Sequence, residues 1–272
     1  MWQGCPQSLR GTVLLYRRRR CISFKKFCFG EEKEAEITIS PIKELKEISR
    51  KIISDDLFVV EFKIEKRNNI PNPIKLEVKH VETVDSTMPA SREYIDKGNT
   101  SPFIYTTKIQ THGKGKGDRN WAGSIEGNIY TSCSIPTYMI KNELDVNDVI
   151  VKITAISIIQ QLRQFAKNEF FLKYPNDILC KDKKKLGGII AEKYKDFCII
   201  GFGINIVNMP EQDQIRKEGL SPCYVNAHLP KDGKKPNELE LSIDITKQII
   251  YNLGLTLADI DNLFENYVTV DQ

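Results

Sequence analysis

Helix-like and strand-like segments are mixed along this chain of 272 residues, but strands and helices do not alternate one by one. A regular strand–helix–strand alternation would indicate a doubly wound parallel sheet, whereas a mixed order favours an α+β domain. We therefore predict an α+β domain built on a mixed β-sheet flanked by helices. The chain has no internal repeat, and its apolar content of 40% can supply a core.

The spacing of apolar residues places the expected elements. Apolar residues at helical spacing predict helices at 42–54 and 148–167, with two more near 242–252 and 257–267. Short apolar or alternating runs predict strands at 57–64, 76–84, 103–107, 128–134, 170–174 and 197–206, and a hairpin over 178–192. Polar residues, Pro and Gly indicate a long loop over 208–240.

The positive charge is concentrated at the N-terminus. Residues 1–30 contain seven of the 40 Lys/Arg residues and no acid, so 33 Lys/Arg and all 36 Asp/Glu remain in residues 31–272, a net charge of −3 there. We therefore expect no broad cationic surface for nucleic acid. An acid-free, arginine-rich leader is compatible with an organellar transit peptide, a nuclear address or a disordered basic tail.

The seven cysteines are scattered without CxxC or CxH spacing. This argues against a zinc site and against a secreted disulfide framework, and favours reduced intracellular thiols. No apolar run approaches the roughly 18 residues that span a bilayer, so no membrane partner is expected. The expected location is intracellular: cytoplasmic, or mitochondrial or in another organelle if residues 1–30 are a transit peptide.

A glycine- and lysine-rich stretch, QTHGKGKGDRNW, runs from Gln110 to Trp121. Glycine allows close approach of the backbone, and the lysines place positive charge beside bare N–H groups. Such a loop can close over an anion such as a phosphate. It has neither the Walker A nor the Rossmann spacing, and taken alone it could equally be a flexible basic surface loop.

Three further motifs accompany this loop: ETVDST over 82–87, KYPND over 173–177 leading into KLGGII over 185–190, and GFGIN over 201–205. In this order and spacing, the motifs resemble the catalytic domain of biotin–protein ligases (holocarboxylase synthetases). That family shows a D-S-T turn, a GRGRxGRxW loop, K-W-P-N-D, K-L-x-G and G-x-G-x-N. The resemblance covers about residues 76–210 and implies a fold like that of class II aminoacyl-tRNA synthetases and biotin synthetases.

The resemblance also implies a reaction. Biotin would attack the α-phosphate of ATP and release pyrophosphate, and a lysine of a biotin carboxyl carrier domain would then attack the biotinyl-5'-AMP. Biotin, ATP and Mg²⁺ are the implied ligands, and carboxylase carrier domains the implied partners. We expect a leader at 1–30, an extension without a helix-turn-helix at 31–75, and a catalytic domain at 76–272 that lacks the family's C-terminal SH3-like domain.

The site residues are carried over from the family motifs, with no protein ligand to a metal assigned. The expected catalytic residues are Lys185, Lys116 and Arg119. The expected biotin-binding residues are Ser86, Thr87, Gln110, Gly113, Gly115, Lys116, Tyr130, Lys185 and Gly188. The expected ATP-binding residues are Lys114, Arg119, Trp121, Asn128, Asn176, Asp177 and Asn205, with Asn176 and Asp177 near the phosphates and Mg²⁺.

The chain departs from the family pattern at several positions. Lysines replace the loop arginines at 114 and 116, Gly117-Asp118 replaces the usual x-Gly, and Met88 stands where Asn is common. The interval from KYPND to Lys185 is one residue longer than is typical. A lipoate or octanoate ligase of the sister family and an inactive biotin- or nucleotide-binding homologue stay as alternatives, and a homodimer is left open.

Overall fold

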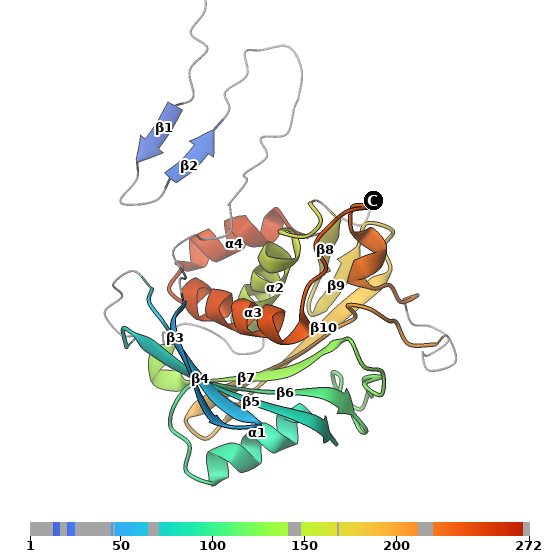
Figure 1. Ribbon diagram of the computed structural model, residues 1–272. Coiled ribbons are helices and arrows are strands. Elements are labelled where there is room, and N and C mark those ends of the chain that lie inside the picture. Colours follow the sequence, from blue (N-terminus) through green and yellow to red (C-terminus); the bar gives the residue numbers. More distant parts are fainter. Residues whose placement is uncertain are drawn as a thin grey trace, which may run out of the picture. The chain divides into compact units, whose positions relative to one another are not determined.

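The computed structural model describes residues 13–16, 21–24, 45, 47–64, 71–140, 148–167, 169–211 and 220–268 (Figure 1). The chain divides into two units, Met1–Pro41 and Ile42–Gln272. In the first unit, β1 (Val13–Tyr16) and β2 (Cys21–Phe24) pair antiparallel. The remainder of the predicted leader lies outside the described residues.

The second unit is built on one nine-stranded sheet, in the order β3-β4-β5-β6-β7-β11-β10-β9-β8. Its strands are β3 (Glu47–Ser54), β4 (Leu57–Phe62), β5 (Ile74–Val84), β6 (Phe103–Gln110), β7 (Ile129–Pro136), β8 (Phe170–Lys173), β9 (Asp177–Cys180), β10 (Lys185–Tyr194) and β11 (Phe197–Ile204). Strands β5 and β6 are parallel, and the other neighbouring pairs are antiparallel. The predicted mixed sheet is therefore confirmed.

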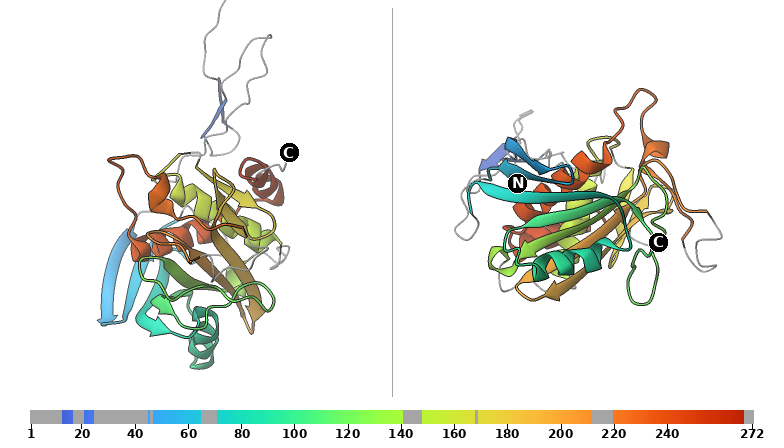
Figure 2. Two further views of the ribbon diagram at one scale, coloured as in Figure 1. Left: turned by 90° about the vertical axis from the view of Figure 1, so that its right-hand side faces the viewer. Right: turned by 60° about the horizontal axis from the view of Figure 1, so that its bottom comes forward.

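Helices cover both faces of this sheet (Figures 1 and 2). One face carries α1 (Thr87–Asp96), and the other carries α2 (Val149–Leu162) and α3 (Glu238–Asn252), with α4 (Leu257–Glu265) packed on α2. Two short 3-10 helices, η1 (Thr137–Met139) and η3 (Val225–His228), lie in the connections. Among the described residues, no helix combines the length and apolar character needed to cross a membrane.

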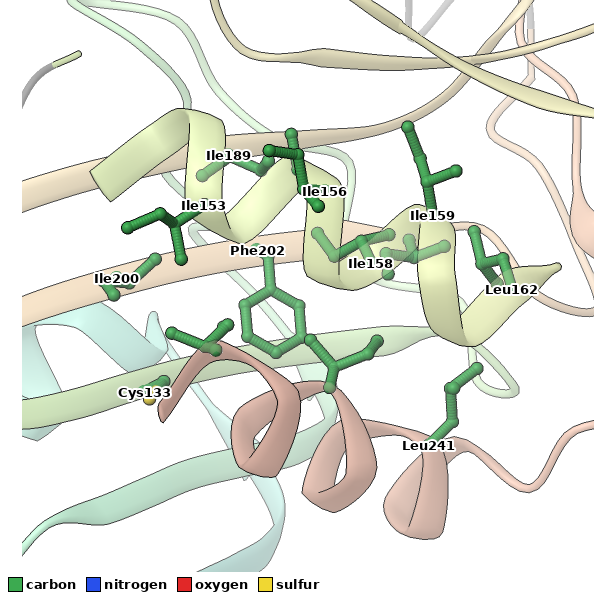
Figure 3. Close-up of a cluster of buried hydrophobic side chains, with 14 of the residues drawn as sticks. Cys133, Ile153, Ile156, Ile158, Ile159, Leu162, Ile189, Ile200, Phe202 and Leu241 are labelled. Atoms are coloured by element: carbon green, nitrogen blue, oxygen red, sulfur yellow. The ribbon is translucent and has the colours of Figure 1, made fainter. Parts of the chain in front are cut away.

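Strand β11 shows how the two layers share one sheet. Successive side chains of a strand point to opposite faces, and Ile200 and Phe202 belong to the large core beneath α2 and α3 (Figure 3). Phe197 and Ile199 belong instead to the smaller core beneath α1. Continuing this alternation places Gly201 and Gly203 on the α1 face, where these two positions add no side chain.

The predicted helix at 42–54 is wrong, because residues 47–54 form the edge strand β3. Ile48 and Ile52 are 50% and 77% exposed, so their helical spacing reflects no buried helix face. The other predicted helices correspond to α2, α3 and α4, and the predicted strands and hairpin are confirmed within a few residues. Residues 212–219 of the predicted long loop lie outside the described part.

Strands β3 and β4 fall within the predicted N-terminal extension. They pair onto β5 and so extend the same sheet that carries the motifs. The expected boundary between residues 75 and 76 falls inside β5. The helix α1 was not predicted at all, although it begins immediately after the Asp-Ser turn.

Candidate functional site

Three glycines form the floor of a pocket on the α1 face of the sheet. Gly188 of β10 lies directly opposite Gly203 of β11, and Gly201 lies two residues before Gly203. A Cβ added to Gly203 would lie 2.5 Å from Trp121 Cε2, and one added to Gly201 would lie 2.9 Å from Met88 Sδ. Because these strand positions carry no side chain, Met88 and Trp121, which line the pocket, can pack directly against the sheet.

Most of the predicted site residues line this one pocket. They are Ser86, Thr87, Gln110, Lys114, Gly115, Lys116, Arg119, Trp121, Asn176, Lys185 and Gly188. The lining also includes residues that were not predicted as site residues: Met88, Asn120, Thr131, Ile189, Ile190, Gly201, Phe202 and Gly203. The period-two pattern of β10 and β11 could have pointed to the two β11 glycines, because it places them on one face with Gly188.

Part of the pocket lining is a hydrogen-bonded polar cluster at the start of α1. The backbone N–H of Thr87 donates to Gln110 Oε1 at 2.8 Å, and Ser132 Oγ donates to Thr87 Oγ1 at 2.7 Å. Ser86 is the N-cap residue of α1, but its side chain makes no capping hydrogen bond. The Ser86 hydroxyl can therefore serve a ligand, next to the positive end of the helix dipole.

The glycine–lysine loop folds back on itself as a short hairpin beside the pocket. Trp121 N–H donates to Gly113 O at 2.9 Å, and Gly115 N–H donates to Arg119 O at 2.7 Å. Gly117, near the tip, has a φ of +65°, a left-handed conformation that favours glycine. A Cβ at Gly113 would lie 2.6 Å from Trp121 O, so glycine is also required where the two arms pair.

This pairing carries the charged residues of the loop to the pocket. Lys114 forms a β-bridge with Asn120, and Arg119 Nε donates to Lys116 O at 3.0 Å. Lys114, Lys116 and Arg119 all reach the lining. They make this part of the pocket lining cationic and suited to an anion.

Lys185 sits on a β-bulge at the start of β10. Leu179 pairs with Lys185 and Ile178 pairs with Gly187, so Leu186 is the extra residue between them. A bulge re-aims the neighbouring side chain, and Lys185 Nζ lies 2.7 Å from Asp177 Oδ1 and 5.7 Å from the centre of the Trp121 ring.

Apart from Asp177 Oδ1, which faces Lys185 Nζ, two buried polar atoms of the predicted site residues lack a hydrogen-bond partner among the described residues. They are Trp121 Nε1 and Asn205 Oδ1. The Asn205 amide is otherwise used, because its Nδ2 donates to Cys223 O at 3.0 Å. Since an unpaired buried polar atom is costly, each atom is a candidate contact for a bound ligand.

Five predicted site residues do not line the pocket: Gly113, Asn128, Tyr130, Asp177 and Asn205. Asn128 Oδ1 accepts from Ile206 N–H at 2.8 Å, and Asn128 Nδ2 donates to Tyr130 Oη at 3.3 Å. Tyr130 lies opposite Gly203, but its hydroxyl donates to Ile125 O, and burial raises the pKa of this phenol. Both side chains hold neighbouring loops, and their contacts with a ligand stay predictions.

The α+β fold carries a glycine-floored pocket that is lined both by the polar cluster at the start of α1 and by the cationic loop, an arrangement suited to small anionic molecules. Residues 81–205 match the model of the Biotin/lipoate A/B protein ligase family, and this part of the chain is a domain of that family. The resemblance drawn from the motifs is therefore confirmed.

Individual relatives agree with this assignment. A biotin–[acetyl-CoA-carboxylase] ligase of Mycobacterium tuberculosis is 28% identical over 110 residues, which are 40% of this chain and 41% of that protein. The match thus spans less than half of the relative's length. A Leishmania major biotin protein ligase in complex with biotin superposes with a TM-score of 0.63 at 25% identity, covering 71% of this chain and 81% of that chain.

A third comparison is the Aquifex aeolicus biotin protein ligase in complex with biotin and ATP. It has a TM-score of 0.51 at 27% identity and covers 65% of this chain and 69% of that chain. These structures share the mixed sheet flanked by helices, which confirms the predicted fold class.

Proposed function

We propose that this chain is an ATP-dependent biotin–protein ligase that forms biotinyl-5'-AMP and transfers biotin to a lysine of a carrier domain. The observation that carries the proposal is the composition of one pocket lining. Ser86, Thr87 and Gln110 supply hydrogen-bonding groups, and Lys116 and Lys185 supply positive charge. Biotinyl-5'-AMP needs both, because its biotin ring system is neutral and polar, and the phosphate between its biotinyl and adenosine parts is anionic.

The cationic residues would stabilise the charge that develops as the carboxylate attacks the α-phosphate. Lys185 is best placed for this, because its ammonium is held by Asp177 and lies beside Trp121 at the glycine floor. Positive groups fixed before the reaction need no reorganisation when charge develops. Lys116 and Arg119 are the proposed partners from the loop, and Lys114 is the proposed contact to ATP.

The remaining contacts follow from the polar atoms around the pocket. Trp121 Nε1 and Asn205 Oδ1, both buried and unpaired among the described residues, are proposed contacts to the nucleotide. Gly113, Gly115 and Gly188 would let the backbone approach biotin and its adenylate closely. Asn128 stays a proposed contact to ATP, and Tyr130 stays a proposed contact to biotin. Both also hold neighbouring loops in place.

Asn176 and Asp177 fit the requirements of Mg²⁺. Asn176 Nδ2 donates to Ile189 O at 3.1 Å, which orients its amide oxygen, and Asp177 supplies a carboxylate next to Lys185. Mg²⁺ prefers oxygen ligands and is commonly held by one or two carboxylates together with substrate phosphates. Bound there, the ion would neutralise phosphate charge, while Lys185 holds its position through Asp177.

The first test is biotin-dependent exchange of labelled pyrophosphate into ATP, with lipoate and octanoate in parallel. Exchange with biotin alone supports the proposal without any carrier protein. Exchange with lipoate or octanoate instead would assign the sister activity, and no exchange with a folded protein would leave a binding homologue. Mass analysis of a purified biotin carboxyl carrier domain then tests transfer. The intracellular compartment and the oligomeric state stay predictions.

A further inference from the structure

The side chains of Cys180, Cys223 and His228, all common metal ligands, lie close together near the start of β10, the strand that carries Lys185. Cys180 ends β9, Cys223 follows the long connection after β11, and His228 ends η3. Their sulfur and nitrogen atoms all lie within 4.8 Å of one another. Both cysteines are buried, and the His228 side chain is 12% exposed.

These distances suit a tetrahedral ion. Zinc lies about 2.3 Å from a cysteine sulfur and about 2.0 Å from a histidine nitrogen, so two ligand atoms on a tetrahedron are roughly 3.3–3.8 Å apart. The cluster therefore needs to contract by about 1.5 Å at most, which small rotations of the three side chains can supply. Two sulfurs and an imidazole are also a donor set that zinc commonly takes.

The surroundings of His228 match those of a metal ligand. Its Nδ1 lies 3.6 Å from Glu169 Oε2, and its ring packs against Phe170 with the centroids 6.1 Å apart. A carboxylate on one imidazole nitrogen fixes the ring and leaves the other nitrogen to bind the ion. A water would complete the fourth position.

The Cys223 thiol donates weakly to Lys184 O at 3.4 Å. Zinc binds the thiolate form of cysteine, so metal binding would release this proton and the affinity should rise with pH.

We propose that Cys180, Cys223 and His228 bind one zinc-like divalent ion, a site separate from the biotin pocket. The ion would join two segments that already meet at Lys185: Lys185 N–H donates to Ser221 O at 2.7 Å, and Cys223 N–H donates to Lys185 O at 2.9 Å. Metal binding would thus stiffen the backbone on both sides of Lys185. The spacing of the cysteines in the sequence gave no sign of this site, because 42 residues separate Cys180 from Cys223.

The test uses the full chain, purified with reductant, stripped with chelator and titrated with Co²⁺ and then Zn²⁺. Tetrahedral thiolate coordination gives Co²⁺ strong visible bands and a sulfur charge-transfer band, both of which Zn²⁺ should remove. We expect about one equivalent bound, with Cys180→Ser, Cys223→Ser and His228→Ala each losing the bands. Glu169→Gln should weaken binding by about 10-fold or more. Circular dichroism verifies that each variant is folded.

Cys133→Ser is the matched control, since Cys133 is equally buried but lies in the core beneath α2 and α3 (Figure 3), and it should bind as the unmodified chain does. Three results would overturn the proposal. They are the absence of a tightly bound metal equivalent, metal binding that survives the three ligand substitutions, and a Cys180–Cys223 disulfide in protein alkylated at lysis. None of these readouts involves biotin or ATP, so the outcome is independent of the proposed ligase activity.

Discussion

Lys185 and Asp177 form an ion pair across the β9–β10 hairpin, with Nζ 2.7 Å from Oδ1. The two side chains are 27% and 21% exposed, so water reaches the pair but does not surround it. The carboxylate holds the ammonium at the edge of the glycine floor before any substrate binds. This fixed position distinguishes Lys185 from Lys183 and Lys184, its neighbours in the KDKKK run.

Lys185→Ala should lower kcat/KM for pyrophosphate exchange by ~100-fold or more, because it removes one preorganised group that faces developing charge. Lys184→Ala is the matched control, since only the backbone carbonyl of Lys184 is engaged in the described contacts. It should stay within about threefold of the unmodified chain. Equal losses in the two variants would remove Lys185 from its proposed role.

Gly203→Ala should close the pocket, because the added Cβ would lie 2.5 Å from Trp121 Cε2. Overpacking of this kind costs about 1–3 kcal/mol of stability, and biotin binding measured by calorimetry should weaken. Gly188→Ala should do less, since its Cβ would lie 3.3 Å from the same ring. The double variant Gly203→Ala/Trp121→Ala should recover the stability lost through the clash. If it does not, the strand itself requires glycine.

Gln110→Leu should destabilise the start of α1. It removes the acceptor of the Thr87 N–H in a buried position, and an unsatisfied buried donor costs about 1–3 kcal/mol. Gln110→Glu keeps an acceptor and should cost less. Urea unfolding measures the stability, and biotin titration shows whether the polar part of the pocket lining is lost as well. Identical effects of Leu and Glu would argue that this hydrogen bond is unimportant.

Arg50→Met should lower the free energy of unfolding by at most about 1 kcal/mol at pH 7, because the ion pairs of Arg50 with Glu47 and Glu240 are partly exposed. Arg50 Nη1 lies 2.6 Å from Glu240 Oε1 and joins β3 to α3. The hydrogen bond from Arg50 holds the pKa of Glu240 below its ordinary value of 4.5. The stabilisation is therefore complete above pH 4.5 and is lost as pH falls through the lowered pKa.

Urea unfolding of the two proteins between pH 7 and pH 3.5 measures this dependence. Lys51→Met, next to Arg50 on β3, controls for the general effect of removing a charge from the edge strand. A difference of equal size at every pH would instead assign the contribution of Arg50 to its stacking over Phe58, where the guanidinium lies 5.2 Å from the ring centre.

The motifs predicted much of the site because the residues that line the pocket are local to strand ends and turns. Gln110 ends β6, Lys185 begins β10 and Thr87 begins α1 three residues after β5 ends, so placing the strands also places these side chains. Helix α1 was missed because its first turn contains Thr87, Met88 and Pro89, which show no apolar periodicity. Strand β3 was mistaken for a helix because an exposed edge strand need not alternate.

Long-range contacts could not be predicted in the same way. The Asn128 amide accepts from a backbone N–H at Ile206, 78 residues further along the chain, and the cluster of Cys180, Cys223 and His228 depends on how the connection after β11 returns to β9. The spacing of residues in the sequence does not show where a long connection comes back to the sheet. They are set by tertiary packing, which a motif within one segment does not describe.

The glycine floor also limits how the size of this pocket can change. Gly188, Gly201 and Gly203 already have the smallest side chain available, so no substitution there can make room for a larger substrate. On the opposite face of β11, Ile200 and Phe202 are buried in the main core and leave the strand little freedom to withdraw. A larger pocket must therefore come from smaller side chains in place of Met88 or Trp121, which lie over Gly201 and Gly203.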